Sequence, residues 1–296
     1  MGGTDIMRFL LLTLGLTIVF STPAYSEEQE NLITQLKRQA GQGEATAQYA
    51  LGLMYYDGEG VPQDYAKAVA WWTKAAAQGN ADAQTALGLM YYKGEGVPQD
   101  YAKAVAWWTK AAAQGHADAQ LNLGVMYAQG QGVPQDYAKA REWFTKAAAQ
   151  GEATAQFNLG LMYYKGEGVP QDYAKTVEWY TKAAAQGNAD AQFSLGVMYD
   201  EGKGVPQDYA KAKEWLTKAA AQGHAGAQFN FGVMYYKGEG VPQDYVQAHK
   251  WLNLAASKGQ ENAMKARDML ATRMTPDQIA EAQRLAREWK PKTSEP

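Results

Sequence analysis

YYKGEGVPQDYAKAVAWW, residues 91–108, is one of six nearly identical stretches in this chain of 296 residues. The Val–Pro pair inside it recurs every 36 residues, from residues 61–62 to residues 241–242. A fixed period of this length is typical of proteins built from stacked structural repeats. The chain is therefore expected to be a repeat array.

Each copy contains two helical patterns separated by a turn. In copy one, apolar residues recur at helical spacing in ATAQYALGLMYYDG (residues 45–58) and in DYAKAVAWWTKAAAQG (residues 64–79). Between them, Gly58 permits the positive φ that ends a helix, and Pro62 keeps the residue before it extended. Asp64 is suited to cap the second helix. Each copy is predicted to be a helical hairpin, with helices about 20 Å long at 1.5 Å per residue.

Small residues at constant positions predict close contact between the two helices of a hairpin. Gly52 on the first helix and Ala68 and Ala75 on the second leave room for a neighbouring helix, and Trp71 is expected to fill the core. Its counterpart Trp143 is likewise predicted to be buried. One hairpin cannot cover its own apolar face, so the copies are expected to stack. A core position or a half-exposed ridge is predicted for the series Trp72, Trp108, Phe144, Tyr180, Leu216 and Leu252.

These residues resemble the Sel-one-like repeat, a relative of the tetratricopeptide repeat. The resemblance covers roughly residues 45 to 260, with six copies in phase. It implies an all-α fold, a right-handed α-solenoid of helix-turn-helix repeats with a 36-residue period, that scaffolds protein complexes. In copy one it rests on Ala45, Ala47, Leu51, Gly52, Tyr55, Gly58, Gly60, Val61, Asp64, Lys67, Ala68, Trp71, Lys74, Ala75, Ala76 and Gly79.

The first 26 residues have the pattern of a secretory signal peptide. Arg8 precedes an apolar run at residues 9–20, and the small residues Ala24 and Ser26 precede an acidic segment. The run is shorter than the roughly 20 residues of a membrane-spanning helix. Cleavage after Ser26 is expected, which places the protein in the periplasm or outside the cell. An uncleaved membrane anchor is the alternative.

The two ends of the array differ in sequence from the repeats and suit terminal caps. Thr275, Pro276 and Gln278 predict a capping box at the start of the last helix. The expected segments are a signal peptide (1–26), an N-terminal capping half-repeat helix (27–43), six repeats (44–262), C-terminal capping helices (263–290) and a disordered tail (291–296).

The sequence carries no pattern typical of a catalytic, cofactor or metal site. It has no cysteine, and its net charge of −3 without a basic segment gives no sign of a nucleic-acid interface. His116 and His224 share one repeat position, where other copies also carry polar residues. This spread predicts a helix junction or cap rather than a metal ligand. The loop GEGVP lacks the Lys-Ser/Thr pair of phosphate-binding loops.

Positions at which the copies differ are not fixed by packing, so they are candidates for recognition. In a tetratricopeptide-like hairpin the first helix lines a groove, here with residues 46, 49, 50, 53, 56 and 57 and their equivalents. Apolar groups beside amides and mixed charges suit an extended peptide or a partner helix. The alternative is that the phenylalanines pack against the next hairpin. The candidate partner-binding residues are Leu121, Asn122, Phe157, Asn158, Tyr164, Lys165, Phe193, Phe229, Asn230, Tyr236 and Lys237.

The function expected from these patterns is that of an exported, non-enzymatic scaffold or adaptor that binds a protein or peptide partner in the groove. The alternative is a secreted factor that acts on host or neighbouring cells. A weaker alternative follows from the resemblance alone, since cysteine-rich relatives are described as binding or hydrolysing β-lactams. Those relatives have disulfide-linked hairpins, which this chain cannot form.

Overall fold

The computed structural model describes residues 24–291, which form helices and no strand. Most of the predicted signal peptide and of the predicted tail lies outside the described residues. None of the helices between residues 24 and 291 is long and apolar enough to cross a membrane.

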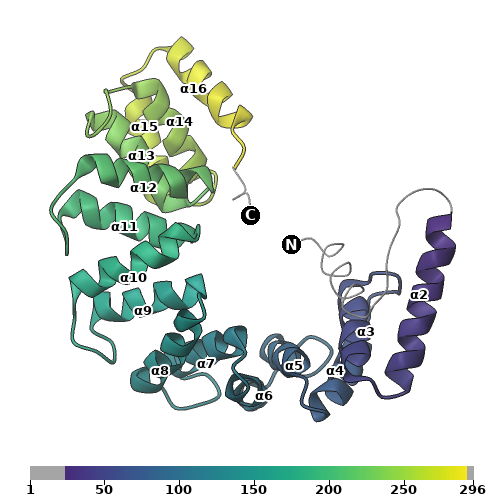
Figure 1. Ribbon diagram of the computed structural model, residues 1–296. Helices are drawn as coiled ribbons and strands as arrows, with labels where there is room; N and C mark the ends of the chain where they lie inside the picture. The colour runs from purple at the N-terminus through teal and green to yellow at the C-terminus, as the bar shows by residue number, and fades with distance from the viewer. Residues whose placement is uncertain (1–23, 292–296) are drawn as a thin grey trace. The chain divides into compact units, whose positions relative to one another are not determined.

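Each of the six repeats is a pair of helices, as predicted (Figure 1). The first helices are α3 (Ala45–Asp57), α5 (Ala81–Lys93), α7 (Ala117–Gln129), α9 (Ala153–Lys165), α11 (Ala189–Glu201) and α13 (Ala225–Lys237). The second helices are α4 (Tyr65–Ala77), α6 (Tyr101–Ala113), α8 (Tyr137–Ala149), α10 (Tyr173–Ala185), α12 (Tyr209–Ala221) and α14 (Tyr245–Ala256). The repeats are flanked by α2 (Ala24–Gly41), α15 (Glu261–Ala271) and α16 (Pro276–Glu288).

The chain divides into two compact units, residues 1–147 and 148–296. In the first unit α3 packs against α4 and α5 against α6, and each second helix also packs against the first helix of the next repeat. In the second unit the pairs α9–α10, α11–α12 and α13–α14 are joined in the same way. This confirms an all-α, solenoid-like packing of 36-residue repeats.

The predicted helix ends are confirmed. The backbone N–H of Lys67 donates a 2.9 Å hydrogen bond to Asp64 Oδ1, so Asp64 is the N-cap of α4. Gly58 has φ 76°, in the left-handed region that suits glycine, and it ends α3. At the other end of the array, Thr275 and Gln278 form the predicted capping box of α16.

A glycine in each first helix makes room for a large side chain from the second. A Cβ atom added to Gly88 would lie 2.4 Å from Trp108 Nε1, which no real contact allows. The indole of Trp108 is 2% exposed, and it donates a 3.1 Å hydrogen bond to the backbone oxygen of Thr85. The core position of the series is confirmed, because all six members are buried: Trp72, Trp108, Phe144, Tyr180, Leu216 and Leu252.

The preceding tryptophan of each second helix is not the central core residue, so the prediction of a buried Trp143 is wrong. Trp143 is half-buried and packs from the side against a cluster formed by α6 and α7. Lys146 Nζ lies 4.2 Å from the centroid of its ring. Neighbouring residues on a helix point about 100° apart, and here the second of the two large side chains faces the glycine. Trp143 therefore joins adjacent repeats.

A buried glutamine in each first helix links consecutive repeats, and the sequence patterns gave no prediction for it. Gln84 Nε2 donates to the backbone oxygen of Ala76, at the end of the preceding helix, over 3.2 Å. Its Oε1 accepts a 2.8 Å hydrogen bond from Gln114 Nε2, at the end of α6. The oxygen of Ala76 also accepts a 3.0 Å bond from the backbone N–H of Gly79, so the glutamine adds a second donor to the end of α4 and ties it to α5 and to the end of α6. The buried glutamines are Gln48, Gln84, Gln120, Gln156, Gln192 and Gln228.

The glutamine link is incomplete in repeat six. Lys258 stands where Gln222 stands one repeat earlier, and it donates to the backbone oxygen of Gly223. Gln228 Oε1 is consequently buried without a hydrogen-bond partner in the described part of the chain. After this repeat the pattern stops, because Asp268 occupies the position of the packing glycine and α16 packs against α14.

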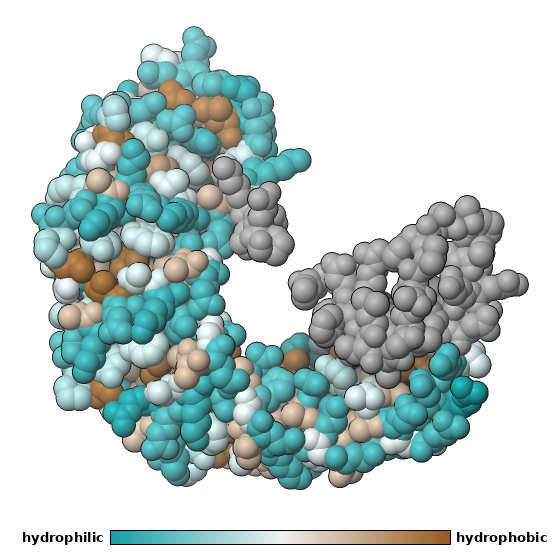
Figure 2. All heavy atoms as spheres, viewed as in Figure 1, coloured by the Kyte–Doolittle hydropathy of each residue, from teal (hydrophilic) through white to brown (hydrophobic). Residues whose placement is uncertain are grey.

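Hydrophobic contacts lie mainly between helices. On the face shown in Figure 2, hydrophilic side chains cover most of the surface and hydrophobic ones form small, separate groups.

The substitution Gly88→Ala is expected to lower the free energy of unfolding by about 1–3 kcal/mol, the usual cost of overpacking a core. The added methyl group must displace Trp108. Urea denaturation of both proteins measures the difference. The control measures Gly88→Ala in a Trp108→Leu background. In the Gly196–Leu216 pair, a Cβ atom added to the glycine would lie 2.8 Å from the leucine Cγ, so the clash is smaller with leucine than with tryptophan. Equal costs of Gly88→Ala in the two backgrounds would contradict the inferred contact between Gly88 and Trp108.

The substitution Lys258→Gln is expected to stabilise the protein by about 0.5–1.5 kcal/mol, the net value of one hydrogen bond. In repeat five, Gln222 Nε2 donates both to Gln192 Oε1 and to the backbone oxygen of Gly187. A glutamine at residue 258 can make the same two bonds and satisfy Gln228. Differential scanning calorimetry provides the measurement, with Lys258→Ala as the control that supplies no donor. A glutamine variant no more stable than the alanine variant would show that Gln228 does not need this partner.

Candidate functional site

A pocket of about 400 Å³ lies on the first-helix surface of the first unit. Its lining comes from α3, α5, α7 and the residue that precedes α7: Tyr49, Asp82, Thr85, Ala86, Leu89, His116, Asp118, Leu121 and Asn122. Except for His116, every lining residue occupies position 46, 49, 50 or 53 of its repeat. The pocket therefore lies on the stripe that the sequence predicts as a groove.

The room in this pocket comes from one small side chain. Thr85 occupies the position at which other repeats carry Tyr49, Leu121 or phenylalanine. In the second unit, the equivalent phenylalanine, Phe193, stacks on the imidazole of His224 with ring centroids 4.5 Å apart. Thr85 places no ring beneath the equivalent His116, and its hydroxyl donates to the backbone oxygen of Ala81 within its own helix.

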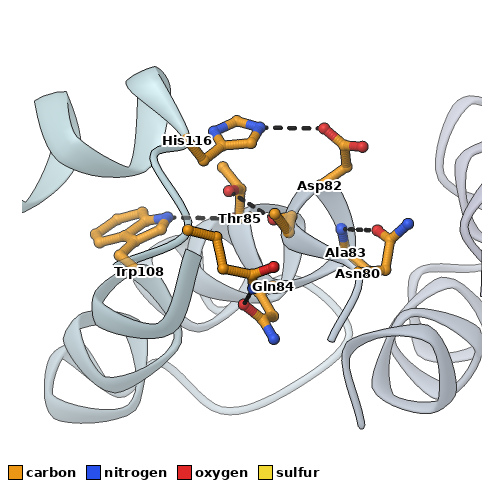
Figure 3. Close-up of polar contacts among 9 residues, drawn as sticks. Asn80, Asp82, Ala83, Gln84, Thr85, Trp108 and His116 are labelled. Carbon is orange, nitrogen blue, oxygen red and sulfur yellow. Dashed lines mark hydrogen bonds and ion pairs between the residues drawn. The ribbon is translucent and has the colours of Figure 1, made fainter. Parts of the chain in front are cut away.

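A histidine–aspartate pair forms one side of the pocket. His116 Nε2 lies 3.1 Å from Asp82 Oδ1, and Figure 3 shows the side chain of Asp82, on α5, meeting that of His116, the residue before α7. This hydrogen bond raises the pKa of His116 above its ordinary value and lowers the pKa of Asp82. The second carboxylate, Asp118, is exposed. The pocket therefore has two acidic groups and one imidazole, whose charge depends on pH.

Tyr49 closes the pocket on the α3 side as a neutral group. Burial, together with the charges of Asp82, Asp118 and Asp57, raises the pKa of Tyr49 to about 12. The phenol stays protonated at physiological pH and contributes an aromatic surface and a hydrogen-bond donor.

The prediction of a helix cap at the histidine position is confirmed for His224. Its Nδ1 accepts a 3.1 Å hydrogen bond from the backbone N–H of Ala227, at the start of α13. Burial lowers the pKa of His224, which suits the neutral imidazole that this bond requires. His116 occupies the same N-cap position of α7 but forms no cap bond with its side chain.

Among the predicted partner-binding residues, Leu121 and Asn122 line the pocket. The phenylalanines make internal contacts: Phe157 stacks on Tyr180 at 5.2 Å, Phe193 stacks on His224, and Phe229 packs against the cluster around α14. Packing against the next hairpin is the alternative considered for them, and each of the three packs against a cluster that includes residues of the following helix pair. All three remain half-buried.

The predicted tyrosines and lysines already have partners. Tyr164 accepts a 2.9 Å hydrogen bond from Lys203, and Tyr236 accepts a 2.7 Å hydrogen bond from Arg273. The ammonium groups of Lys165 and Lys237 pair with the glutamates two residues further on, at 3.8 Å and 3.4 Å. These pairs are exposed and therefore of small energy.

The three predicted asparagines differ from these residues. Asn122, Asn158 and Asn230 are half-buried. Within residues 24–291, no hydrogen bond to another residue ends on their side-chain amides. An amide of this kind can donate two hydrogen bonds and accept two. No group of three or more His, Asp or Glu side chains in the same region could hold a metal ion.

Six consecutive segments of the chain match the Sel1 repeat: residues 45–80, 81–116, 117–152, 153–188, 189–224 and 225–260. These segments coincide with the six helical pairs. No curated protein is similar to the chain.

Several solved structures are similar. A Sel1 repeat protein from Oxalobacter formigenes is 33% identical, with a TM-score of 0.72, over 78% of this chain and 93% of its own. A protective antigen of uropathogenic Escherichia coli with an SLR fold is 29% identical, with a TM-score of 0.39, over 86% and 85% of the two chains. A putative sel1 repeat protein from Klebsiella pneumoniae is 26% identical, with a TM-score of 0.45, over 69% and 99%.

The six matched segments, the 36-residue helical pairs and the likeness to the Oxalobacter protein agree with one another. This chain belongs to the Sel1 repeat family.

Proposed function

We propose that this protein is a non-enzymatic adaptor that binds an extended segment of another protein on its first-helix surface. The observation that carries the proposal is the position of the pocket. It lies where the repeats differ in sequence, whereas the glycine and glutamine positions that hold the repeats together are constant.

The chemistry of this surface suits a polypeptide. Asn122, Asn158 and Asn230 offer side-chain amides that form no bond within the described chain, and such groups pair well with peptide N–H and C=O groups. Beside them, Leu121 and Phe157 provide half-buried apolar contact area. Each unit carries at least one such amide, so a partner segment can be held on either unit.

The pocket does not support hydrolysis, although it contains a threonine, a histidine and an aspartate. A nucleophile must lie within hydrogen-bond reach of its base. The hydroxyl of Thr85 instead donates to the oxygen of Ala81 at 2.9 Å, and His116 Nδ1 is buried without a partner in the described chain. The arrangement favours binding over catalysis.

We further propose that the adaptor is exported. The support is the sequence pattern of residues 1–26, with an apolar run and small residues before an acidic segment.

Photo-crosslinking in intact cells tests the proposed function. A photoreactive amino acid at residue 121, on the first-helix surface, is expected to give a discrete protein adduct. The matched control places it at residue 106, which is exposed on the second helix α6. Adducts of the same protein from both positions, or from neither, would count against a first-helix partner site.

The partner identified in this way then permits an affinity test. Asn122→Ala, or Asn158→Ala with Asn230→Ala, is expected to weaken binding, since each neutral hydrogen bond is worth about 0.5–1.5 kcal/mol. Ala50 and Ala86 occupy the same position in repeats one and two, so the melting temperature is expected to stay unchanged. The variant that loses affinity identifies the unit that holds the partner. A lower melting temperature with unchanged affinity would assign the asparagines to packing.

A further inference from the structure

We propose that the pocket between α3, α5 and α7 binds the side chain of an arginine in the partner segment. This inference rests on the proposed function and specifies the chemistry that its first unit recognises. The evidence is the charge of the pocket, its walls and the contrast with its counterpart in the second unit.

The pocket is acidic, and its one group that can become a cation is the imidazole of His116. Its nine lining residues include two aspartates and no lysine or arginine. Asp82 uses one carboxylate oxygen for His116, which leaves the other oxygen available. No ion pair or hydrogen bond from the described residues ends on the carboxylate of Asp118. Opposite charge in a partner is the simplest complement to this surface.

The walls of the pocket suit the stem of a long cationic side chain. Ala86, Leu89 and Leu121 are apolar and half-buried, and they lie beside the two aspartates. Arginine and lysine bury their methylene groups against apolar surface while the charged end reaches polar groups. A volume of about 400 Å³ admits such a side chain with part of its backbone.

The number of acceptors favours arginine over lysine. Asp118, the free oxygen of Asp82 and the amide oxygen of Asn122 all line one pocket. A guanidinium group presents five N–H donors in a planar fork and stacks on aromatic rings such as Tyr49, whereas an ammonium group is a compact charge with three donors.

The second unit contains an internal comparison. Asp190 and His224 repeat the pair Asp82–His116, with His224 Nε2 3.2 Å from Asp190 Oδ1. There the position of Thr85 is filled by Phe193, and the position of Asp118 is Gly226. The second unit therefore lacks both the open space and the second carboxylate at this position. The acidic pocket depends on residues particular to the first unit and is not formed by every copy of the repeat.

The test uses peptides of the form acetyl-Ala-Ala-X-Ala-Ala-amide, titrated into the full chain and followed by ¹H–¹⁵N NMR. With X as arginine, shifts are expected at Ala86, Leu121 and the side-chain amide of Asn122. Citrulline has the same shape without the charge and is expected to bind about tenfold more weakly or worse, the factor for one charge-assisted hydrogen bond. Lysine is expected to fall between them.

Three variants test the pocket with residues that the fold already accepts elsewhere. Thr85→Phe introduces the residue that Phe157 supplies in repeat four, where Asp190 occupies the position of Asp118; it fills the open space and is expected to abolish the shifts. Asp118→Thr copies Thr46 and Thr154 and is expected to weaken arginine binding about fivefold or more, the loss of one charged partner. The matched control, Asp190→Thr in the second unit, is expected to leave the affinity unchanged.

The pH dependence of the affinity for the arginine peptide tests the charge of the pocket, because a purely structural role of His116 would not change this dependence. Protonation of His116 adds a positive charge beside Asp82 and Asp118, with Tyr49 neutral throughout, so arginine binding is expected to weaken as the pH falls. Because the hydrogen bond to Asp82 raises the pKa of His116 above its ordinary 6.5, the loss is expected to begin above pH 6.5 and to amount to about two- to fivefold for one partly exposed charge pair. His116→Asn copies Asn80 and is expected to remove this dependence.

Two results overturn the inference. One is equal affinity for the arginine, citrulline and norleucine peptides. The other is arginine binding that Thr85→Phe leaves intact. Neither affects the proposed function, which is tested separately by crosslinking at residue 121. If crosslinking fails while the arginine peptide binds the pocket, the adaptor proposal fails and the recognition of arginine stands.

Discussion

The absence of one Cβ atom in each first helix sets the geometry of every repeat. At Gly88 the missing methyl group lets Trp108 lie directly on the α5 backbone and bond to the oxygen of Thr85. Where the second helix carries leucine, as in the pair Gly196–Leu216, the helices keep the same contact with a smaller group. Because this side chain is directed at its own first helix, the neighbouring tryptophan packs against the preceding repeat, as Trp143 does against α6 and α7.

Glycine and glutamine together leave the remaining surface of the first helix free to change. The glycine fixes the distance within a hairpin, and the buried glutamine fixes the step from one repeat to the next through side-chain and backbone bonds. The glycine and glutamine contacts use no side chain from positions 46, 49 and 50; position 49 contributes only its backbone oxygen to the tryptophan bond. A change as small as threonine for phenylalanine at position 49 therefore alters the surface without altering the frame.

The sequence predicted the helices and their caps because each depends on local chemistry. Asp64 and Gly58 act within a few residues of themselves. The burial of Trp143 was predicted wrongly, because periodicity does not tell which of two adjacent large residues faces the glycine. To predict the pocket, one would need to know how consecutive helix pairs stack, since Asp82 and His116 are 34 residues apart in sequence. The glutamines carried a signal, a constant amide on an apolar helix face, that pattern analysis did not use.

The uniform junction between repeats has a consequence for how such a gene can change. Residues 50–79 and 86–115 differ at one position only, and where the codons are as similar as the residues, the two coding segments can recombine out of register. A crossover of this kind inserts or removes a whole copy, and the new boundary inherits the same glutamine bonds as the old one. The number of copies can thus change while every boundary between repeats keeps the same packing and hydrogen bonds. Because Thr85 travels with copy two, the same event duplicates or deletes this threonine.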